Sequence, residues 1–251
     1  MTTNSASPTA CILLIGNEIL SGKTQDLNLQ YLGSQLASIG VKLLEARVLQ
    51  DDADVIVATV NECRAEFDYV FTTGGIGPTH DDITAQCIAT AFGRELILDE
   101  EAVACLQRGS FELNEARLKM ARVPEGSSLI ANSLSNAPGF RVDNVFVLAG
   151  VPSIARAMFE TLAPDLAAGD PISSRNVDIY LREGDIAGPL EGIASRYADV
   201  EIGSYPFRRD GRLGANLVVR GTDEELLNNV LAEIIDTMTK LGDDSVIGDS
   251  T

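Results

Sequence analysis

The chain has 251 residues and a formal net charge of −18, from 37 acidic and 19 basic side chains. Hydrophobic residues make up 45% of it, which is typical of a globular chain with one large or two smaller domains and argues against a disordered chain. This net charge provides no positive field for nucleic acid or anionic lipid, so neither is expected as a partner. A phosphorylated ligand would have to be bound locally, by backbone N–H groups, a few basic side chains or a divalent cation.

Cysteine usage and the lack of long apolar segments predict a cytoplasmic protein. The four cysteines are far apart and form no C-x-x-C pair, which favours buried free thiols in a reducing compartment over a zinc site or a disulfide framework. Residues 1–8 carry no basic side chain and precede no long apolar segment. No run of about 18 apolar residues occurs anywhere, so no membrane span is expected.

Strands and helices alternate along residues 8–170. The apolar run at 10–15 predicts a strand buried on both faces, and apolar residues at helical spacing over 27–39 predict a helix that ends before Gly40. Such alternation predicts a mainly parallel sheet with helices on both sides, an α/β fold. The other predicted elements are a strand at 41–49, a helix at 53–64, a strand at 69–73, a helix at 83–92, one or two helices within 100–122, strands at 128–130 and 145–149, and a helix at 153–166.

A change of composition near residues 169–171 predicts a second, smaller unit. Its pattern is that of a small α+β module, which we place at residues 171–242, followed by a loose tail at 243–251. The predicted elements of this module are a strand at 177–181, a helix at 185–197, strands at 200–204 and 215–220, and an amphipathic helix at 223–241.

A glycine-rich turn follows the strand predicted at 69–73. Gly74, Gly75 and Gly77 lie between that strand and the next helix, where open α/β sheets place their ligands. Glycines let successive backbone N–H groups approach a phosphate, and Thr79 could donate a hydroxyl. The spacing is neither that of the dinucleotide fingerprint nor that of a Walker loop. The turn therefore predicts a phosphate site of another kind, and the alternative is a tight loop with a helix cap.

Acidic side chains occur at the same strand ends. Asp81 and Asp82 follow the glycines and could hold a divalent cation against a phosphate, or Asp82 could cap the next helix. Glu18, after the first strand, could act as a metal ligand or general base. Asp51, after the second strand, could likewise bind a metal. Glu18 and Asp51 could equally be solvated loop acids.

Among the basic side chains, Lys119 could supply a positive charge to a phosphate, or it could lie on a solvated helix face. His80 is the only histidine, which excludes a site with two histidine ligands, and an exposed loop position is favoured for it. No G-x-S-x-G elbow is present, so a serine nucleophile is not predicted.

These segments together resemble the molybdopterin-binding domain family, in the branch formed by the amino-terminal part of the competence/damage-inducible protein A (CinA) family and the amino-terminal domain of eukaryotic FAD synthases. The resemblance covers nearly the whole chain. It is carried by GNEILSG at 16–22 with Asn28, TGGIGPTHDD at 73–82, KMA at 119–121 with Pro124, NAPGF at 136–140, GVPS at 150–153, GDIA at 184–187 and IGSYP at 202–206.

The chain departs from the family pattern in two respects. Where relatives usually carry Pro-Gly-x-Pro-Ser-Glu, it has AGVPSI at 149–154, so Ala149 and Ile154 replace a proline and a carboxylate. It also lacks the carboxyl-terminal amidase domain of longer CinA proteins, so deamidation of nicotinamide mononucleotide is not expected.

The resemblance implies a three-layer α/β/α fold like that of MogA and MoaB, followed by a small KH-like α+β module. It implies a pocket for molybdopterin or a nucleotide and, in the nearest relatives, a pyrophosphatase that acts on ADP-ribose or FAD-like diphosphates with Mg²⁺, Mn²⁺ or Co²⁺. The alternative is a non-catalytic protein that binds molybdopterin or a nucleotide in molybdenum cofactor biosynthesis. A scaffolding protein without a ligand is a third class. Relatives form dimers or trimers, so self-association is expected.

On the pyrophosphatase hypothesis each candidate residue has a role. The catalytic candidates are Glu18, Asp81 and Asp82, and the metal-binding candidates are Asp51, Asp81 and Asp82. The expected ligand-binding residues are Asn17, Thr73, Gly74, Gly75, Gly77, Thr79, Lys119, Gly150, Pro152 and Ser153.

Overall fold

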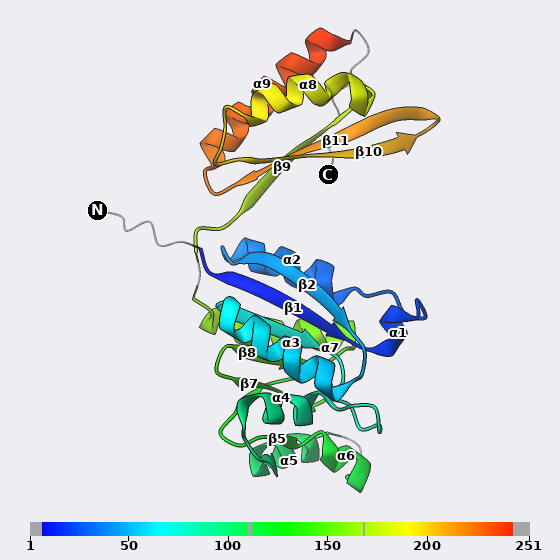
Figure 1. Cartoon of the computed structure of the whole chain (residues 1–251), viewed down its shortest axis with the longest axis vertical. Helices are drawn as coiled ribbons and strands as arrows, with labels where there is room; N and C mark the ends of the chain where they lie inside the picture. Colours follow the sequence, from blue (N-terminus) through cyan, green and yellow to red (C-terminus); the bar gives the residue numbers. More distant parts are fainter. Residues whose placement is uncertain (1–6, 110–111, 168, 243–251) are drawn as a thin grey trace, which may run out of the picture. The chain divides into compact units, whose positions relative to one another are not determined.

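The computed structural model describes residues 7–109, 112–167 and 169–242 (Figure 1). The chain divides into two compact units, Met1–Gly169 and Asp170–Thr251, each with its own core. Within the described residues, no helix has the length and apolar character needed to cross a membrane. The predicted tail at 243–251 lies outside the described residues.

The first unit is built on a six-stranded sheet of order β2-β1-β3-β8-β7-β6. The four strands from β2 to β8 are parallel, whereas β7 pairs antiparallel with both β8 and β6. The α/β fold with a mainly parallel sheet is thereby confirmed. The strands are β1 (Thr9–Ile15), β2 (Lys42–Leu49), β3 (Tyr69–Thr73), β6 (Ser128–Ile130), β7 (Gly139–Val142) and β8 (Val145–Leu148).

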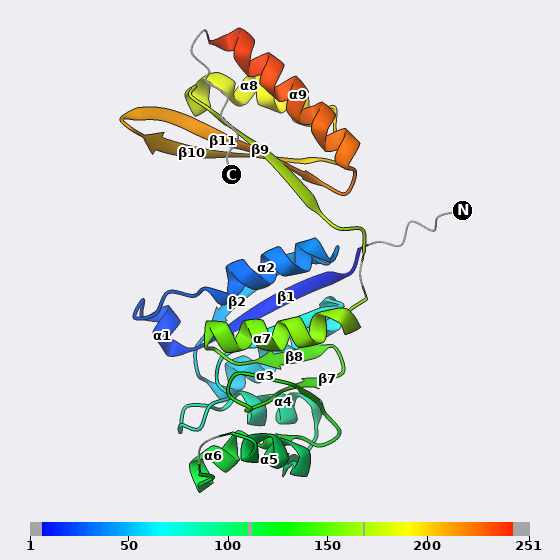
Figure 2. The same ribbon diagram turned by 180° about the vertical axis from the view of Figure 1, so that it is seen from behind.

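Helices cover both faces of this sheet, because successive side chains of a strand point to opposite faces. From Cys11 to Ile15, the odd-numbered residues of β1 join a core with α3 and α4. The even-numbered ones, from Ala10 to Leu14, join a second core with α2 and α7. In Figure 1 α3 lies in front of the sheet, and in Figure 2 α7 does. The unit therefore has three layers. The covering helices are α2 (Asn28–Ser38), α3 (Ala53–Glu66), α4 (Thr84–Phe92) and α7 (Pro152–Leu162).

Three short strands were missed by the sequence patterns: β7, and the antiparallel pair β4 (Leu96–Leu98) and β5 (Arg122–Pro124). Strands of three or four residues are too short to show a period of two. The prediction of helix as far as Arg122 is wrong at its end, because Arg122 begins β5. The remaining elements of this unit are α1 (Asn17–Leu20), α5 (Glu100–Gln107), α6 (Glu115–Lys119) and the 3₁₀ turn η1 (Ala163–Asp165).

The second unit is a three-stranded antiparallel sheet of order β10-β11-β9 with two helices packed against it. Asp223 caps α9 by accepting the N–H of Leu226 at 3.0 Å. The hairpin strands are longer than predicted, because Asp210 and Gly211 adopt positive φ and let the pairing continue to the turn. The elements are β9 (Ser173–Ile179), α8 (Glu183–Ala194), β10 (Glu201–Arg209), β11 (Arg212–Gly221) and α9 (Glu224–Leu241).

All four cysteines are free thiols, as predicted. Cys11, Cys63 and Cys87 are buried, and Cys105 is half-buried. The sulfur atoms of Cys11 and Cys63 lie 3.7 Å apart. Burial raises the pKa of both of these thiols, and it raises the pKa of Cys87 to about 11. These three side chains therefore remain neutral thiols at neutral pH.

We expect Cys105 to be the one thiol that reacts rapidly with an aromatic disulfide reagent in the folded protein, because the thiolate is the reactive species and must be accessible. Titration at neutral pH should give one fast equivalent in the native protein and four in denaturant. Cys105→Ser should abolish the fast phase. A fast phase that survives in Cys105→Ser would contradict the burial of the other three.

Candidate ligand-binding site

The carboxyl ends of four parallel strands meet at one edge of the first sheet, because β2, β1, β3 and β8 are neighbours in that order. Asp51, Asn17, Gly74 and Gly150 follow these four strands. The N–H of Asn17 donates to Oδ2 of Asp51 at 2.9 Å, and Nδ2 of Asn28 donates to the carbonyl oxygen of Gly150 at 2.9 Å. The structure therefore brings the predicted strand-end segments to a single edge.

The glycine turn, residues 74–77, is closely packed against its neighbours. Gly74 and Gly75 have φ of 99° and 69°. A Cβ on Gly74 would lie 2.1 Å from the carbonyl oxygen of Ile15, and a Cβ on Gly75 would lie 2.1 Å from Oγ1 of Thr84. That hydroxyl donates to the carbonyl oxygen of Gly74 at 2.9 Å. Only glycine fits at these two positions, since both the backbone conformation and the space exclude a side chain.

Thr79 organises the two carboxylates of the acidic loop, residues 79–82. Its N–H donates to Oδ2 of Asp82 at 2.7 Å, and its hydroxyl lies 2.6 Å from that oxygen and 2.5 Å from Oδ1 of Asp81. Hydrogen bonding to Thr79 lowers the pKa of Asp81, which keeps this carboxyl ionised at neutral pH. Asp82 does not cap α4, because its side chain turns back to Thr79 and the N-cap residue is Ile83.

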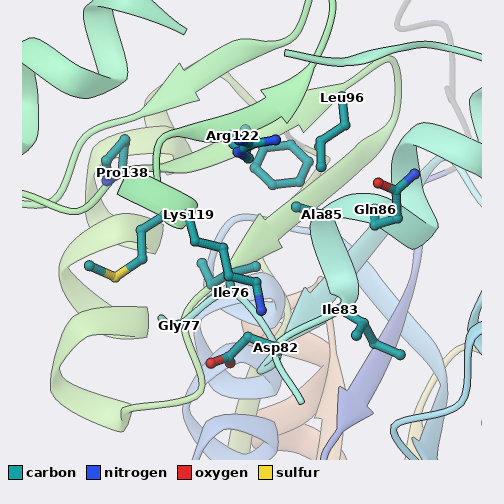
Figure 3. A pocket seen from close by; sticks show the side chains of 13 residues that line it. Ile76, Gly77, Asp82, Ile83, Ala85, Gln86, Leu96, Lys119, Arg122 and Pro138 are labelled. Atoms are coloured by element: carbon teal, nitrogen blue, oxygen red, sulfur yellow. The ribbon is translucent and has the colours of Figure 1, made fainter. Parts of the chain in front are cut away.

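A cavity of about 340 Å³ opens beside the glycine turn (Figure 3). This volume is in the range of pockets that bind small molecules. Lys119, at the end of α6, donates its ammonium to the carbonyl oxygen of Thr79, and in Figure 3 it is directed towards Asp82. The polar side chains of the lining are Asp82, Gln86, Lys119 and Arg122. The larger apolar ones are Ile76, Ile83, Leu96, Met120, Pro138 and Phe140.

The cavity includes only part of the predicted site. Gly75, Gly77, Asp82 and Lys119 line it. Thr73 is buried at the end of β3, and the side chain of His80 is 99% exposed, in the loop position that was favoured for it. The predicted residues that do not line the cavity are Asn17, Glu18, Asp51, Thr73, Gly74, Thr79, Asp81, Gly150, Pro152 and Ser153.

Two polar residues of the cavity were missed by sequence reasoning: Gln86, in α4, and Arg122. Gln86 lies just beyond the glycine motif, and Arg122 was assigned to a helix. The sequence did contain an indication that the helix ends before Arg122. A residue before proline avoids the helical conformation, and Val123 precedes Pro124. That rule would have placed the chain next to Arg122 in an extended segment.

The acidic loop offers a divalent ion two carboxylates. Within the ranges that the structure describes, no three His, Cys, Asp or Glu side chains form a group that could hold a metal ion. Mg²⁺ is commonly bound by one or two carboxylates while phosphate oxygens and waters complete its shell. Asp81 and Asp82 therefore fit an ion that is shared with a phosphorylated ligand, and do not form a complete protein cage.

Ile154 occupies the place where the family pattern has a carboxylate. It lies in the first turn of α7, half-buried, and packs against the core that α2 and α7 share. Its N–H donates to the carbonyl oxygen of Val151 at 3.0 Å. This position contributes packing and provides no acid.

Comparisons with known proteins agree with the fold and the motifs. A family model described as a probable molybdopterin binding domain matches residues 11–168, and one described as the FAD synthase middle domain matches residues 171–244. Among solved structures, CinA from Thermoplasma acidophilum, whose function is given as unknown, has a TM-score of 0.59 and 33% identity. This match covers 62% of this chain and 98% of that one.

Two sequence relatives represent the two halves of the predicted branch. A probable FAD synthase from Caenorhabditis elegans is 32% identical over 257 residues, covering 90% of this chain and 49% of the relative. A CinA-like protein from Citrifermentans bemidjiense is 36% identical over 203 residues, covering 76% of this chain and 49% of the relative. The chain spans about half the length of these two relatives. It therefore belongs to the molybdopterin-binding (MoaB/Mog-like) domain family, in the branch of CinA-like proteins and FAD synthases.

Proposed function

We propose that this chain binds a molybdopterin- or nucleotide-like phosphorylated ligand in the cavity beside the glycine turn, and that it hydrolyses ADP-ribose or FAD-like diphosphates with the help of a divalent ion. One observation carries the proposal. Gly75 and Gly77 of the glycine turn, the side chain of Lys119 and the side chain of Asp82 line the same cavity. They would offer a diphosphate backbone donors, a positive charge and a place for a cation.

Phosphate binding is a local property in a chain of net charge −18. Lys119 is half-buried and held by the carbonyl oxygen of Thr79, so its ammonium stays beside the cavity. The glycine turn lets the main chain approach the ligand without a side chain in between. These two features would hold the diphosphate in the cavity.

Hydrolysis would break one P–O–P bond, with water attacking one phosphorus and the other phosphate leaving, to give two phosphate monoesters and a proton. When bound, Mg²⁺, Mn²⁺ or Co²⁺ polarises a phosphoryl oxygen and acidifies a water. Asp81 and Asp82 would hold the ion together with phosphate oxygens, oriented by their hydrogen bonds to Thr79. Glu18 and Asp51 do not line the cavity, so they are the candidate general base and a further candidate metal ligand only for a substrate that extends along the same sheet edge, where Asp51 accepts the N–H of Asn17.

A non-catalytic binding protein linked to molybdenum cofactor biosynthesis is the second candidate. Ile154 favours it, because this residue provides packing where the family pattern has a carboxylate. On this alternative the cavity would bind the same kind of ligand and release no product.

Release of nucleoside monophosphate from ADP-ribose and FAD tests the proposal, with Mg²⁺, Mn²⁺ or Co²⁺ and with chelator. We expect metal-dependent release that falls about 100-fold or more in Asp82→Asn, because the amide keeps the acceptor for Thr79 but loses the charge. Asp165→Asn, at an exposed residue of η1, is the control and should leave the rate unchanged. Unchanged turnover in Asp82→Asn would exclude Asp82 from catalysis. Ligand binding without release under any metal would favour the second candidate.

A further inference from the structure

Strand β2 forms one edge of the first sheet, with β1 on one side and no strand that the structure describes on the other. The carbonyl oxygen of Leu49 accepts the N–H of the residue that follows β1, at 3.0 Å, so it points towards β1. Because the backbone groups of a strand alternate between its two edges, those of Ala46 and Val48 point outwards. Such an open edge is a template for pairing with a further strand.

The side chains of this edge alternate between apolar and charged. Leu44, which has no partner residue in β1, is 62% exposed, Val48 is 41% exposed, and Ala46 between them is also exposed. Glu45 and Arg47 lie on the opposite face, where they form an ion pair of 2.6 Å with each other. Edge strands are usually protected by lysine, proline or charges that repel a second strand. Here the two charges are of opposite sign, and the apolar side chains are left open to solvent.

A two-fold axis through Ala46 would make this edge complementary to itself. In an antiparallel pair about that axis, Ala46 lies opposite Ala46 of the second copy, and each Leu44 lies opposite a Val48. Because Ala46 points its backbone groups outwards, the two copies of this residue form a hydrogen-bonded pair. Glu45 and Arg47 then form the closer, non-hydrogen-bonded pairs, with Cα atoms about 4.5 Å apart. Cross-strand pairs of opposite charge and of apolar side chains both stabilise a sheet.

Other positions of the axis lack this match. An axis through Glu45 or through Arg47 would place that residue opposite its own copy, and like charges directly opposite each other are destabilising. An axis through Leu44 or Val48 would not bring the two charged residues opposite each other. The charge pattern therefore selects the axis at Ala46.

We infer that two copies of this chain associate through β2, paired antiparallel about a two-fold axis at Ala46, so that their two sheets become one continuous sheet. The contact is isologous, because the same surface of each copy meets the other, and a closed dimer is the result. None of the residues that line the cavity belongs to β2, so the inference does not depend on the proposed function.

Sedimentation equilibrium of the whole chain tests this inference. We expect the wild type to have twice the mass of one chain. Ala46→Pro removes the outward N–H at the axis, and proline is tolerated where an edge strand faces solvent, so this variant should fold and sediment as a monomer. Glu191→Arg, at an exposed residue of α8, is the control and should remain a dimer.

Charge reversal tests the position of the axis. Glu45→Arg and Arg47→Glu each place like charges at both cross-strand pairs, so each should weaken the dimer about 10-fold or more. In an equimolar mixture of the two variants, a mixed dimer has opposite charges at both pairs and should form. Native mass spectrometry with one variant labelled with ¹⁵N identifies the mixed dimer. Circular dichroism confirms that each variant alone is folded.

Three results would overturn the inference. One is a wild type that remains a monomer up to its solubility limit. Another is an assembly that Ala46→Pro and both charge variants leave unchanged, because its interface would then lie elsewhere. The third is a mixture of Glu45→Arg and Arg47→Glu that stays monomeric, since the two side chains would then not face each other across the axis.

Discussion

Replacing Gly74 with alanine is expected to destabilise the first unit by about 3 kcal/mol or more, or to prevent its folding. The new Cβ would lie 2.1 Å from the carbonyl oxygen of Ile15, and the φ of 99° is unfavourable for any residue with a side chain. The clash involves the backbone of β1, which is paired on both sides with β2 and β3 and cannot move away. Hydrogen exchange in peptides from β1 and β3, together with urea unfolding, measures the loss.

Gly93 provides the matched control for this substitution. It also has a positive φ, 61°, but a Cβ there would meet nothing within 4 Å. Gly93→Ala should therefore lower the free energy of unfolding by only about 1 kcal/mol, the cost of placing a residue with a side chain at positive φ. If both variants lose the same amount of stability, the close contact with Ile15 does not add to the cost of Gly74→Ala. In that case the glycine turn would be determined by its backbone conformation alone.

The parts of the fold that could be predicted from sequence are those with a long local pattern. The strand at 69–73 was predicted to the residue, and the helix before Gly40 ends where predicted because a residue with φ of 72° follows its C-cap. Helix α9 of the second unit was predicted from the spacing of its apolar residues and from Asp223, which caps it. In each case residues within one element determine its limits.

The short strands depend on contacts that are distant in sequence. β7 is fixed by pairing with β6 and β8, and a Cβ on Gly139 would lie 2.4 Å from the carbonyl oxygen of Val147, so the close approach of β8 determines this residue. β4 and β5 stabilise each other across the helices between them. No pattern within three or four residues contains this information.

The same distinction applies to the candidate site. The glycine turn was predictable because local backbone geometry and its place after a strand both point to it. The cavity was not predictable from sequence. Lys119 contacts Thr79, which is 40 residues away in the sequence, and Arg122 lies on β5, a strand that forms only by pairing with β4. Sequence therefore predicted Gly75, Gly77, Asp82 and Lys119 of the cavity lining, and the structure was needed for the rest of that lining.

Replacing Lys119 with methionine is expected to weaken binding of inorganic pyrophosphate about 10- to 100-fold, the loss typical of a charge-assisted hydrogen bond. Methionine keeps much of the apolar stem but removes the ammonium. Asp81 and Asp82 would then face the incoming phosphate with no compensating charge from this side chain, in a chain that is already strongly acidic. Lys42→Met, at an exposed residue of β2, is the control and should bind like the wild type.

Salt dependence separates the two ways in which Lys119 could act. If its charge attracts the ligand, the wild-type affinity should fall with increasing salt and Lys119→Met should flatten that dependence, because mobile ions screen charge–charge attraction. If Lys119 acts only by holding the loop through the carbonyl oxygen of Thr79, the variant should lose affinity while the slope stays unchanged. An unchanged slope would therefore contradict direct phosphate binding by Lys119. Asp81 and Asp82 would then attract the diphosphate only through a bound cation, and the affinity of the wild type should disappear in chelator.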